Sequence, residues 1–198
     1  MRVIAGSAKG RQLKGPPSRR RGDRSTAARP SSDMVRGALF NALEAMGADF
    51  SSVLDLYAGT GALGIEALSR GAESCDFVER DRAMADVIRQ NLELTGFSNR
   101  ARVYPIAAER ALERLSGPYS LVLADPPYAD AGAADLLERL ARAALVEDDA
   151  VVVYEHGARD EPRGDLGPFS LAKQLRHGDS AVSIYLPAGR GTTGGEHC

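Results

Sequence analysis

A carboxylate, two prolines and an aromatic ring stand together in the stretch Asp125-Pro126-Pro127-Tyr128. The apolar run before it, residues 121–123, predicts a buried strand. The prolines end that strand, because proline cannot donate a hydrogen bond to a sheet and fixes its own φ. Ligands of open α/β sheets bind at this carboxyl end of the strands. We therefore expect these four residues to lie at the edge of a binding site.

Such a cluster suits methyl transfer to an exocyclic amine on a planar base. That amine is a poor nucleophile, because its lone pair is delocalised into the ring. The Asp125 carboxylate and the Pro126 carbonyl can accept its two N–H bonds and aim the lone pair at an incoming methyl group, while Tyr128 stacks on the ring. The same residues are also common in plain turns, so the stretch alone leaves both interpretations open.

A second motif predicts a nucleoside site. Gly59, Gly61 and Gly64 satisfy the pattern G-x-G-x-x-G at the end of a predicted strand, where a helix begins. Glu79 stands at the tip of the next predicted strand, where an acid can accept hydrogen bonds from both hydroxyls of a ribose. Glycines in a strand-to-helix turn can also be present only because they permit a tight bend. The strand, helix and acid around them favour nucleoside binding.

The ligand of this second motif is a dinucleotide or S-adenosylmethionine. Asp55, inside the preceding strand, favours S-adenosylmethionine, because a carboxylate suits a cationic amino-acid portion better than a pyrophosphate. The position of Asp125 on the fourth predicted strand, beside the same pocket, favours it as well.

The main body alternates strands with helices, which predicts parallel β-α-β units and a doubly wound sheet with helices on both faces. The predicted strands are 53–57, 75–79, 101–106, 120–123 and 150–154, and the predicted helices are 61–69, 81–94, 107–115 and 131–145. Residues 169–175 and 181–186 predict an antiparallel hairpin that closes the sheet.

The chain begins with a basic segment. Residues 2–6 and 11–13 predict a small hairpin, residues 15–30 a mobile loop, and Ser31 or Ser32 the cap of a helix that ends near Gly47. We therefore expect a basic N-terminal extension over residues 1–47, a catalytic domain over 48–187 and a disordered tail over 188–198.

Charge is distributed unevenly along the 198 residues. Residues 1–36 hold ten Lys or Arg and only two acids, although the whole chain has a net charge of −2. A basic segment on an acidic body favours a polyanionic partner at one end, and we expect nucleic acid there. The predicted RNA contacts are Arg2, Lys9, Arg11, Arg19, Arg20, Arg21 and Arg36.

Composition excludes several other classes. No apolar run is long enough for a membrane span or a secretory signal, so we expect a cytoplasmic protein without membrane contact. The two cysteines, Cys75 and Cys198, suggest neither a disulfide framework nor a metal site. His156 and His177 have no evident partner in the sequence, so we expect each to be structural or exposed. We expect no metal and a monomer.

Together these residues resemble the RsmD-type family of small-subunit ribosomal RNA methyltransferases, over essentially residues 1–186. The motifs that carry the resemblance are 2–6, 10–13, Arg29 to Arg36, 39–41, Val53 to Gly64, 66–72, 77–79, 125–128 and 178–180. The stretch from Arg29 to Asn41 is the discriminating one, because the glycine loop and Asp-Pro-Pro-Tyr occur in many methyltransferases. The chain departs from the family at Ser31-Ser32, where a Thr pair is usual, and at Gly37, where an acid is usual.

The resemblance implies a class I S-adenosylmethionine-dependent methyltransferase fold, with a Rossmann-like, mostly parallel sheet. It implies methyl transfer to the 2-amino group of a guanine in the helix 31 loop of 16S rRNA, within the assembled small (30S) subunit. Asp125, Pro126, Pro127 and Tyr128 would then be catalytic. The residues expected to contact the donor are Asp55, Tyr57, Gly59, Thr60, Gly61, Glu79, Arg80, Arg29 and Ser32.

Three alternatives stay open. An adenine or cytosine amino-methyltransferase would use the same Asp125 chemistry, although the chain has no room for a large DNA-recognition domain. A nicotinamide oxidoreductase would use the glycine loop alone. A non-catalytic RNA-binding assembly factor would keep the pocket without the reaction.

Overall fold

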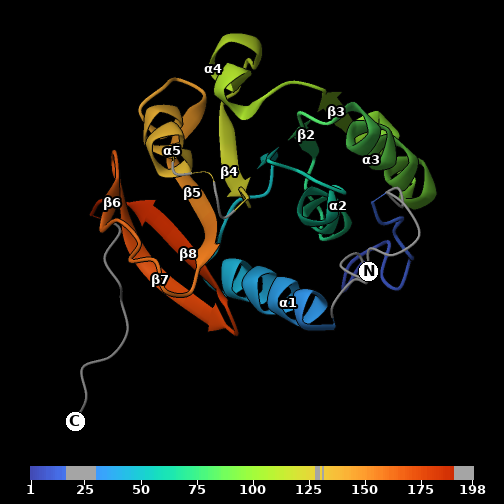
Figure 1. The fold of residues 1–198 in the computed structure, drawn as a ribbon, viewed down its shortest axis with the longest axis horizontal. Helices are drawn as coiled ribbons and strands as arrows, with labels where there is room; N and C mark the ends of the chain where they lie inside the picture. Colours follow the sequence, from blue (N-terminus) through green and yellow to red (C-terminus); the bar gives the residue numbers. More distant parts are fainter. Residues whose placement is uncertain (17–29, 128–129, 131, 190–198) are drawn as a thin grey trace.

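The computed structural model describes residues 1–16, 30–127, 130 and 132–189, and for residues 30–32 the backbone alone. Its elements alternate along the main body as predicted (Figure 1). The helices are α1 (Pro30–Ala45), α2 (Ala62–Ser69), α3 (Arg82–Thr95), α4 (Ala111–Arg114) and α5 (Ala133–Ala141), with short 3-10 turns at Ser98–Arg100 and Ala108–Arg110. The strands are β1 (Ser52–Leu56), β2 (Ser74–Val78), β3 (Ala101–Tyr104), β4 (Tyr119–Ala124), β5 (Val146–Gly157), β6 (Asp165–Leu166), β7 (Phe169–His177) and β8 (Ser180–Pro187).

The strands form one sheet in the order β3-β2-β1-β4-β5-β8-β7-β6. Strands β1 to β5 pair in parallel, whereas β8, β7 and β6 continue the sheet antiparallel. The chain leaves β1 toward β2 on one side and returns to β4 on the other, so β1 and β4 flank the switch point of the sheet. Binding sites of doubly wound folds lie outside the carboxyl ends of the strands at this point. The predicted fold class, with its closing hairpin, is confirmed.

Helices cover both faces of the curled sheet (Figure 1). On one face, α1, α2 and α3 pack on side chains such as Val53, Phe77 and Leu123. On the other face, α4 and α5 pack on Leu54, Val122 and their neighbours. Because successive side chains of a strand alternate between faces, the central strands are apolar at almost every position.

The capping signals at α3 are confirmed. The Asp81 side chain accepts a hydrogen bond from the Ala83 amide at 2.8 Å, and Gly96 ends the helix in the left-handed conformation, with a φ of 81°. The cap predicted for α1 at Ser31 or Ser32 is wrong, because the helix already begins at Pro30. Proline is favoured in the first turn, where its missing N–H costs no helical hydrogen bond.

Several other predicted boundaries are wrong. The strand predicted over 101–106 ends at Tyr104, and the helix predicted over 107–115 is a 3-10 turn followed by the short α4. The helix predicted over 131–145 ends at Ala141, because the Leu145 carbonyl accepts the amide of Tyr119 at 2.8 Å and the chain must be extended by that point. The strand predicted over 150–154 runs from Val146 to Gly157, because Val146 pairs with Tyr119 of β4 and residues 155–157 pair with β8. In the part of the chain that the structure describes, no helix has the length and apolar character needed to cross a membrane.

Candidate active site

A cleft of about 1160 Å³ opens at the carboxyl ends of β1, β2, β4 and β5. Its walls come from the turn after β1, the tip of β2, the residues that follow β4, the end of β5 and the turn between β7 and β8. The first turns of α1 and the N-terminus complete it, through Val35 and Met1. Cavities that hold one small ligand measure roughly 300–1,000 Å³. This cleft therefore has room for a nucleoside-sized cofactor together with part of a second ligand.

The structure brings the two sequence motifs into this one cleft. Of the residues predicted for donor binding or catalysis, the described ones that line it are Asp55, Tyr57, Gly59, Thr60, Glu79, Arg80, Asp125, Pro126 and Pro127. Gly61 lies at the N-terminus of α2 beneath them. Tyr128 and Arg29 lie outside the described residues, and nothing is described of the Ser32 side chain.

Asp55 lies at the floor of the cleft and is almost fully buried. Its carboxylate accepts the backbone N–H of Gly64 at 2.9 Å. Burial raises the pKa of Asp55 well above its ordinary value; the Gly64 hydrogen bond opposes this shift, and the Asp125 and Glu79 carboxylates add to it. A cation near Asp55 would offset both the cost of burying its negative charge and the repulsion from Asp125 and Glu79.

The turn after β1 is shaped by backbone conformation. Gly59 has a φ of +54°, and a Cβ at this position would meet no atom within 4 Å, so the surface above it is open. Gly64 serves packing instead, because a Cβ there would lie 2.4 Å from the Phe77 ring. Tyr57 has a φ of 63°, which is rare for a residue with a side chain and is typical of functional sites.

Glu79 is held in a fixed orientation. One carboxylate oxygen accepts the Gly59 N–H at 2.9 Å, and the other accepts the Asp81 N–H at 2.7 Å. Each oxygen keeps a further lone pair, so the carboxylate can still accept hydrogen bonds from a diol. Because one of its partners is Gly59, Glu79 also fixes the turn that lies beneath the cleft.

Asp125 directly follows β4 and is accessible from the cleft. Its pKa is raised to about 7, first because the surrounding walls desolvate the carboxyl group and second because Glu155 lies nearby. A carboxyl group with this pKa exists in both protonation states near neutral pH, which suits proton transfer. Pro126 is buried beside it, whereas Pro127 is exposed.

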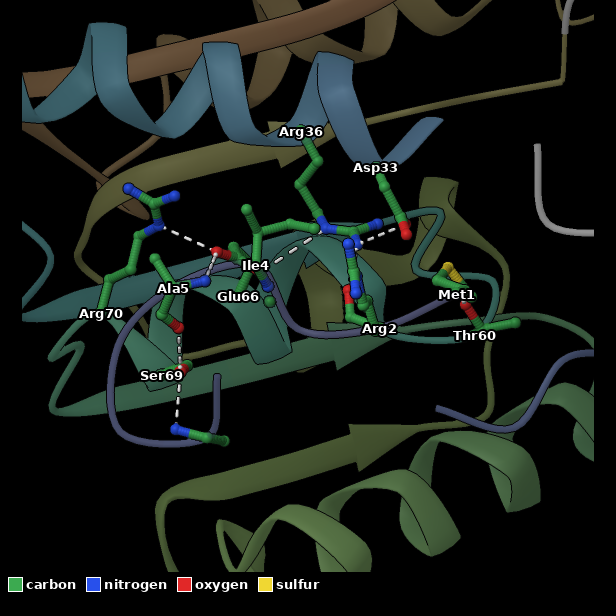
Figure 2. A network of polar contacts seen from close by, with 12 residues as sticks. Met1, Arg2, Ile4, Ala5, Asp33, Arg36, Thr60, Glu66, Ser69 and Arg70 are labelled. Atoms are coloured by element: carbon green, nitrogen blue, oxygen red, sulfur yellow. Dashed lines mark hydrogen bonds and ion pairs between the residues drawn. The ribbon is translucent and has the colours of Figure 1, made fainter. Parts of the chain in front are cut away.

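Arg36 is not on the surface, so the prediction that it contacts RNA is wrong. It is buried, with 4% of its surface exposed. Its guanidinium pairs with Asp33 at 2.9 Å and with Glu66 at 3.6 Å, and it also donates to the Arg2 carbonyl (Figure 2). A cation enclosed in this way cannot reach a phosphate on the surface, and its role is to hold α1 on the N-terminal segment.

The N-terminal segment is anchored rather than free. The fully buried Glu66 of α2 accepts the backbone amides of Ile4 and Ala5 at 2.8 and 3.0 Å (Figure 2). The predicted basic hairpin is present in a short form: one antiparallel bridge joins Arg2 and Gln12. The Val3 and Leu13 amides also donate to the Arg11 and Met1 carbonyls, each at 3.0 Å. The segment leads Met1 to the cleft, where its sulfur lies 3.8 Å from the Thr60 hydroxyl.

Three predicted RNA contacts, Arg2, Lys9 and Arg11, are exposed on this anchored segment. The other three, Arg19, Arg20 and Arg21, lie outside the described residues. Met1 of this segment lines the cleft, whereas Arg2, Lys9 and Arg11 do not.

Sequence reasoning missed several cleft residues. Glu155 lies at the end of β5, and the β7–β8 turn, His177 to Ser180, lines the cleft as well. His177, predicted to be structural or exposed, is exposed beside the cleft. A signal was present for Glu155, because it follows an apolar run in the way that Asp125 does.

Comparison with known proteins agrees with this geometry. The family described as "Conserved hypothetical protein 95" matches residues 1–186. The chain belongs to this family, which contains the RsmD-type proteins. A Bacillus subtilis relative named "Putative rRNA methyltransferase YlbH" is 37% identical over 96% of this chain and all of its own length. "Ribosomal RNA small subunit methyltransferase D" of Escherichia coli is 31% identical over 96% of this chain and 92% of its own.

Solved structures give the same result for the fold. The structure described as "Putative methyltransferase yhhF from Escherichia coli" superposes with a TM-score of 0.80, covering 96% of this chain and 99% of that chain at 30% identity. The family therefore has the class I S-adenosylmethionine-dependent methyltransferase fold that the sequence predicted.

Proposed function

We propose that this protein transfers a methyl group from S-adenosylmethionine to the 2-amino group of a guanine in 16S rRNA, in the helix 31 loop of the small (30S) subunit. One observation carries the proposal: Asp55, Glu79 and Asp125, which suit the donor and the amine, line one cleft. The names of the relatives support rRNA as the substrate class. A ribosomal substrate would place the protein in the cytoplasm, where we expect it to act as a monomer.

The cleft fits the donor. Glu79 would accept the ribose hydroxyls, Arg80 and Tyr57 would line the adenosine, and Asp55 would lie near the cationic amino-acid portion above the Gly59–Gly61 turn. Arg29 and Ser32 would cover the donor from the start of α1. When bound, S-adenosylmethionine supplies a methyl group on a positively charged sulfur, and this charge suits a floor that holds the buried Asp55.

Residues around β4 would handle the base. The Asp125 carboxylate and the Pro126 carbonyl would accept the two N–H bonds of the amine, and Tyr128 would stack on a base that is flipped out of its loop. Methyl transfer would form the N–C bond as the C–S bond of the donor breaks, and Asp125 or water would take the proton that the amine loses. Most of the rate acceleration would come from positioning and local electrostatics, because the thioether leaving group needs no acid.

RNA would be held outside the cleft. Arg2, Lys9 and Arg11 would contact phosphates, together with Arg19, Arg20 and Arg21, which gives affinity and register but little sequence choice. We accordingly propose residues 1–47 as the RNA-contacting extension of a catalytic domain over 48–187, followed by a tail over 188–198.

The test is transfer of labelled methyl groups to small subunits from a strain that lacks this gene, with naked 16S rRNA and DNA in parallel. We expect one guanine on the subunit to become 2-methylguanine, and Asp125→Asn to lower the rate of labelling by about 100-fold or more. Asp149→Asn, the same change at an exposed position of β5, should leave the rate unchanged. Label on DNA would favour an adenine or cytosine methyltransferase. Donor binding without any label would favour an assembly factor.

A further inference from the structure

We propose that Glu155 selects guanine, by accepting the hydrogen bond of the ring N–H beside the amine that Asp125 holds. The inference rests on the proposed function, because it concerns how the same cleft recognises its base. Neither the sequence motifs nor the names of the relatives assign a role to Glu155.

Sheet register places the two carboxylates side by side. Strands β4 and β5 are parallel neighbours, and their last register pair is Ala124 with Tyr154. Asp125 directly follows β4, and Glu155 is the next residue of β5; both line the cleft, and Glu155 lies close enough to raise the pKa of Asp125. Neighbouring strands lie about 4.8 Å apart, and residues of the same register point to the same face. The two carboxyl groups can therefore contact neighbouring atoms of one ligand.

Glu155 is oriented from the other side by β8. Its partner in the β5–β8 ladder is Val182, and the Ser180 side chain hydrogen-bonds to its carboxylate. Within the described part of the chain, Glu155 forms no ion pair with a Lys or Arg side chain, although the adjacent His156 opposes the rise in the pKa of Glu155 that burial causes. Two adjacent carboxylates without a shared cation repel each other, so a ligand that donates hydrogen bonds to both would stabilise them.

Among the nucleobase amines, only that of guanine has a second hydrogen-bond donor beside it. The 2-amino group of guanine is flanked by the ring N1–H, so guanine presents two neighbouring donors. The amines of adenine and cytosine are flanked by ring nitrogens that accept hydrogen bonds instead. With Asp125 on the amine, a carboxylate at the adjacent position attracts guanine N1–H and repels the lone pair of the other two bases.

The experiment compares Glu155→Gln with the wild-type enzyme on two substrates. The first is the undermethylated small subunit, and the second is the same subunit with the target guanine replaced by adenine. Glu147→Gln is the matched control, because it makes the same change on the same strand, at the end away from the cleft. Donor affinity and thermal unfolding are measured for each variant, so that a loss of fold is recognised separately.

We expect Glu155→Gln to lower kcat/KM for the guanine substrate by about 10- to 100-fold, as the removal of one charged hydrogen bond to a base predicts. Donor affinity should stay within about twofold. The ratio of adenine to guanine methylation should rise, because the glutamine amide can donate to adenine N1. This ratio does not depend on the fraction of folded enzyme, so it keeps the test valid if the variant is less stable.

An unchanged ratio and an unchanged guanine rate in Glu155→Gln would overturn this inference while leaving the proposed function intact. The proposed function fails separately if the wild-type product is not 2-methylguanine, which nucleoside analysis of the first substrate decides. A loss of guanine methylation in Glu147→Gln equal to that in Glu155→Gln would also overturn the inference, because the effect would then not belong to the cleft.

Discussion

Replacing Glu66 by glutamine should unfold the protein at a much lower temperature. The Glu66 side chain is 1% exposed, and its oxygens serve the Ile4 and Ala5 amides, Arg70 at 2.9 Å and Arg36 at 3.6 Å (Figure 2). The two arginine side chains are only 5% and 4% exposed. The substitution removes the negative charge that compensates both cations, and it turns an N–H donor toward other donors.

The size of the effect follows from burial. Removing one partner of a buried ion pair lowers the free energy of unfolding by about 3–5 kcal/mol, because the other charge is left buried and uncompensated. For a chain of 150–250 residues, 1 kcal/mol corresponds to about 2–4 °C in Tm, so we expect a decrease of roughly 6–20 °C. Thermal and denaturant unfolding followed by circular dichroism measure this, and hydrogen exchange at Ile4 and Ala5 should accelerate.

Glu44→Gln is the matched control. Glu44 also pairs with Arg70, at 3.0 Å, but its side chain is 49% exposed. Exposed pairs contribute about 0–1 kcal/mol, so this variant should lose little stability. If Glu66→Gln lost less than about 1 kcal/mol, or no more than Glu44→Gln, the reasoning from burial would be refuted. Because the anchored segment carries Met1 to the cleft, we also expect Glu66→Gln to weaken donor binding.

Three further predictions concern the cleft, its packing and its charge. Asp125→Asn should lower methyl transfer by about 100-fold or more while donor binding persists. In the wild type, kcat/KM should fall as the pH drops through about 7, because a protonated Asp125 can no longer accept a hydrogen bond from the amine. A flat profile from pH 6 to 8 would contradict this. Gly64→Ala should destabilise the fold by about 1–3 kcal/mol in denaturant unfolding, because its Cβ would lie 2.4 Å from Phe77, whereas Gly164→Ala, with open space around it, should not. Lys9→Ala with Arg11→Ala should reduce the slope of log affinity for the subunit against log salt by about 1 for each phosphate that is no longer neutralised, and an unchanged slope would remove these residues from the interface.

The order of the elements could be predicted because their signals are local. The glycine turn after β1, the Asp81 cap and the Gly96 stop each specify the backbone within a few residues, and these features lie where the sequence placed them. The boundaries of β5 could not be predicted in the same way. Three of its early residues, Glu147 to Asp149, are charged, and they are included because Val146 before them and Val151 after them both pair with β4.

In the candidate site, too, the residues with local sequence signals could be predicted and the others could not. Glu79 and Asp125 follow apolar runs and Asp55 lies near the end of one, so their place at the carboxyl edge could be predicted from the sequence. The β7–β8 turn and Met1 reach the cleft through the curl of the sheet and the anchoring of the N-terminus, which depend on distant residues such as Glu66. Arg36 was misplaced for this reason: a basic residue in a basic segment suggested the surface, whereas the buried Glu66 draws it inward.

The charges of the molecule constrain how a nucleic acid can approach it. Acidic residues dominate the cleft; they are Asp55, Glu79, Glu109, Asp125, Asp130, Glu155 and Asp179. Such a lining attracts a cationic donor and repels phosphate. Arg36 and Arg80 also line the cleft, so acids outnumber basic side chains there without excluding them. The exposed Arg2, Lys9 and Arg11 of the N-terminal segment lie outside the cleft. A nucleotide that keeps its phosphates on the basic segment and inserts its base alone avoids most of this repulsion. The separation of charge therefore favours a flipped base with hydrogen-bond donors on its edge.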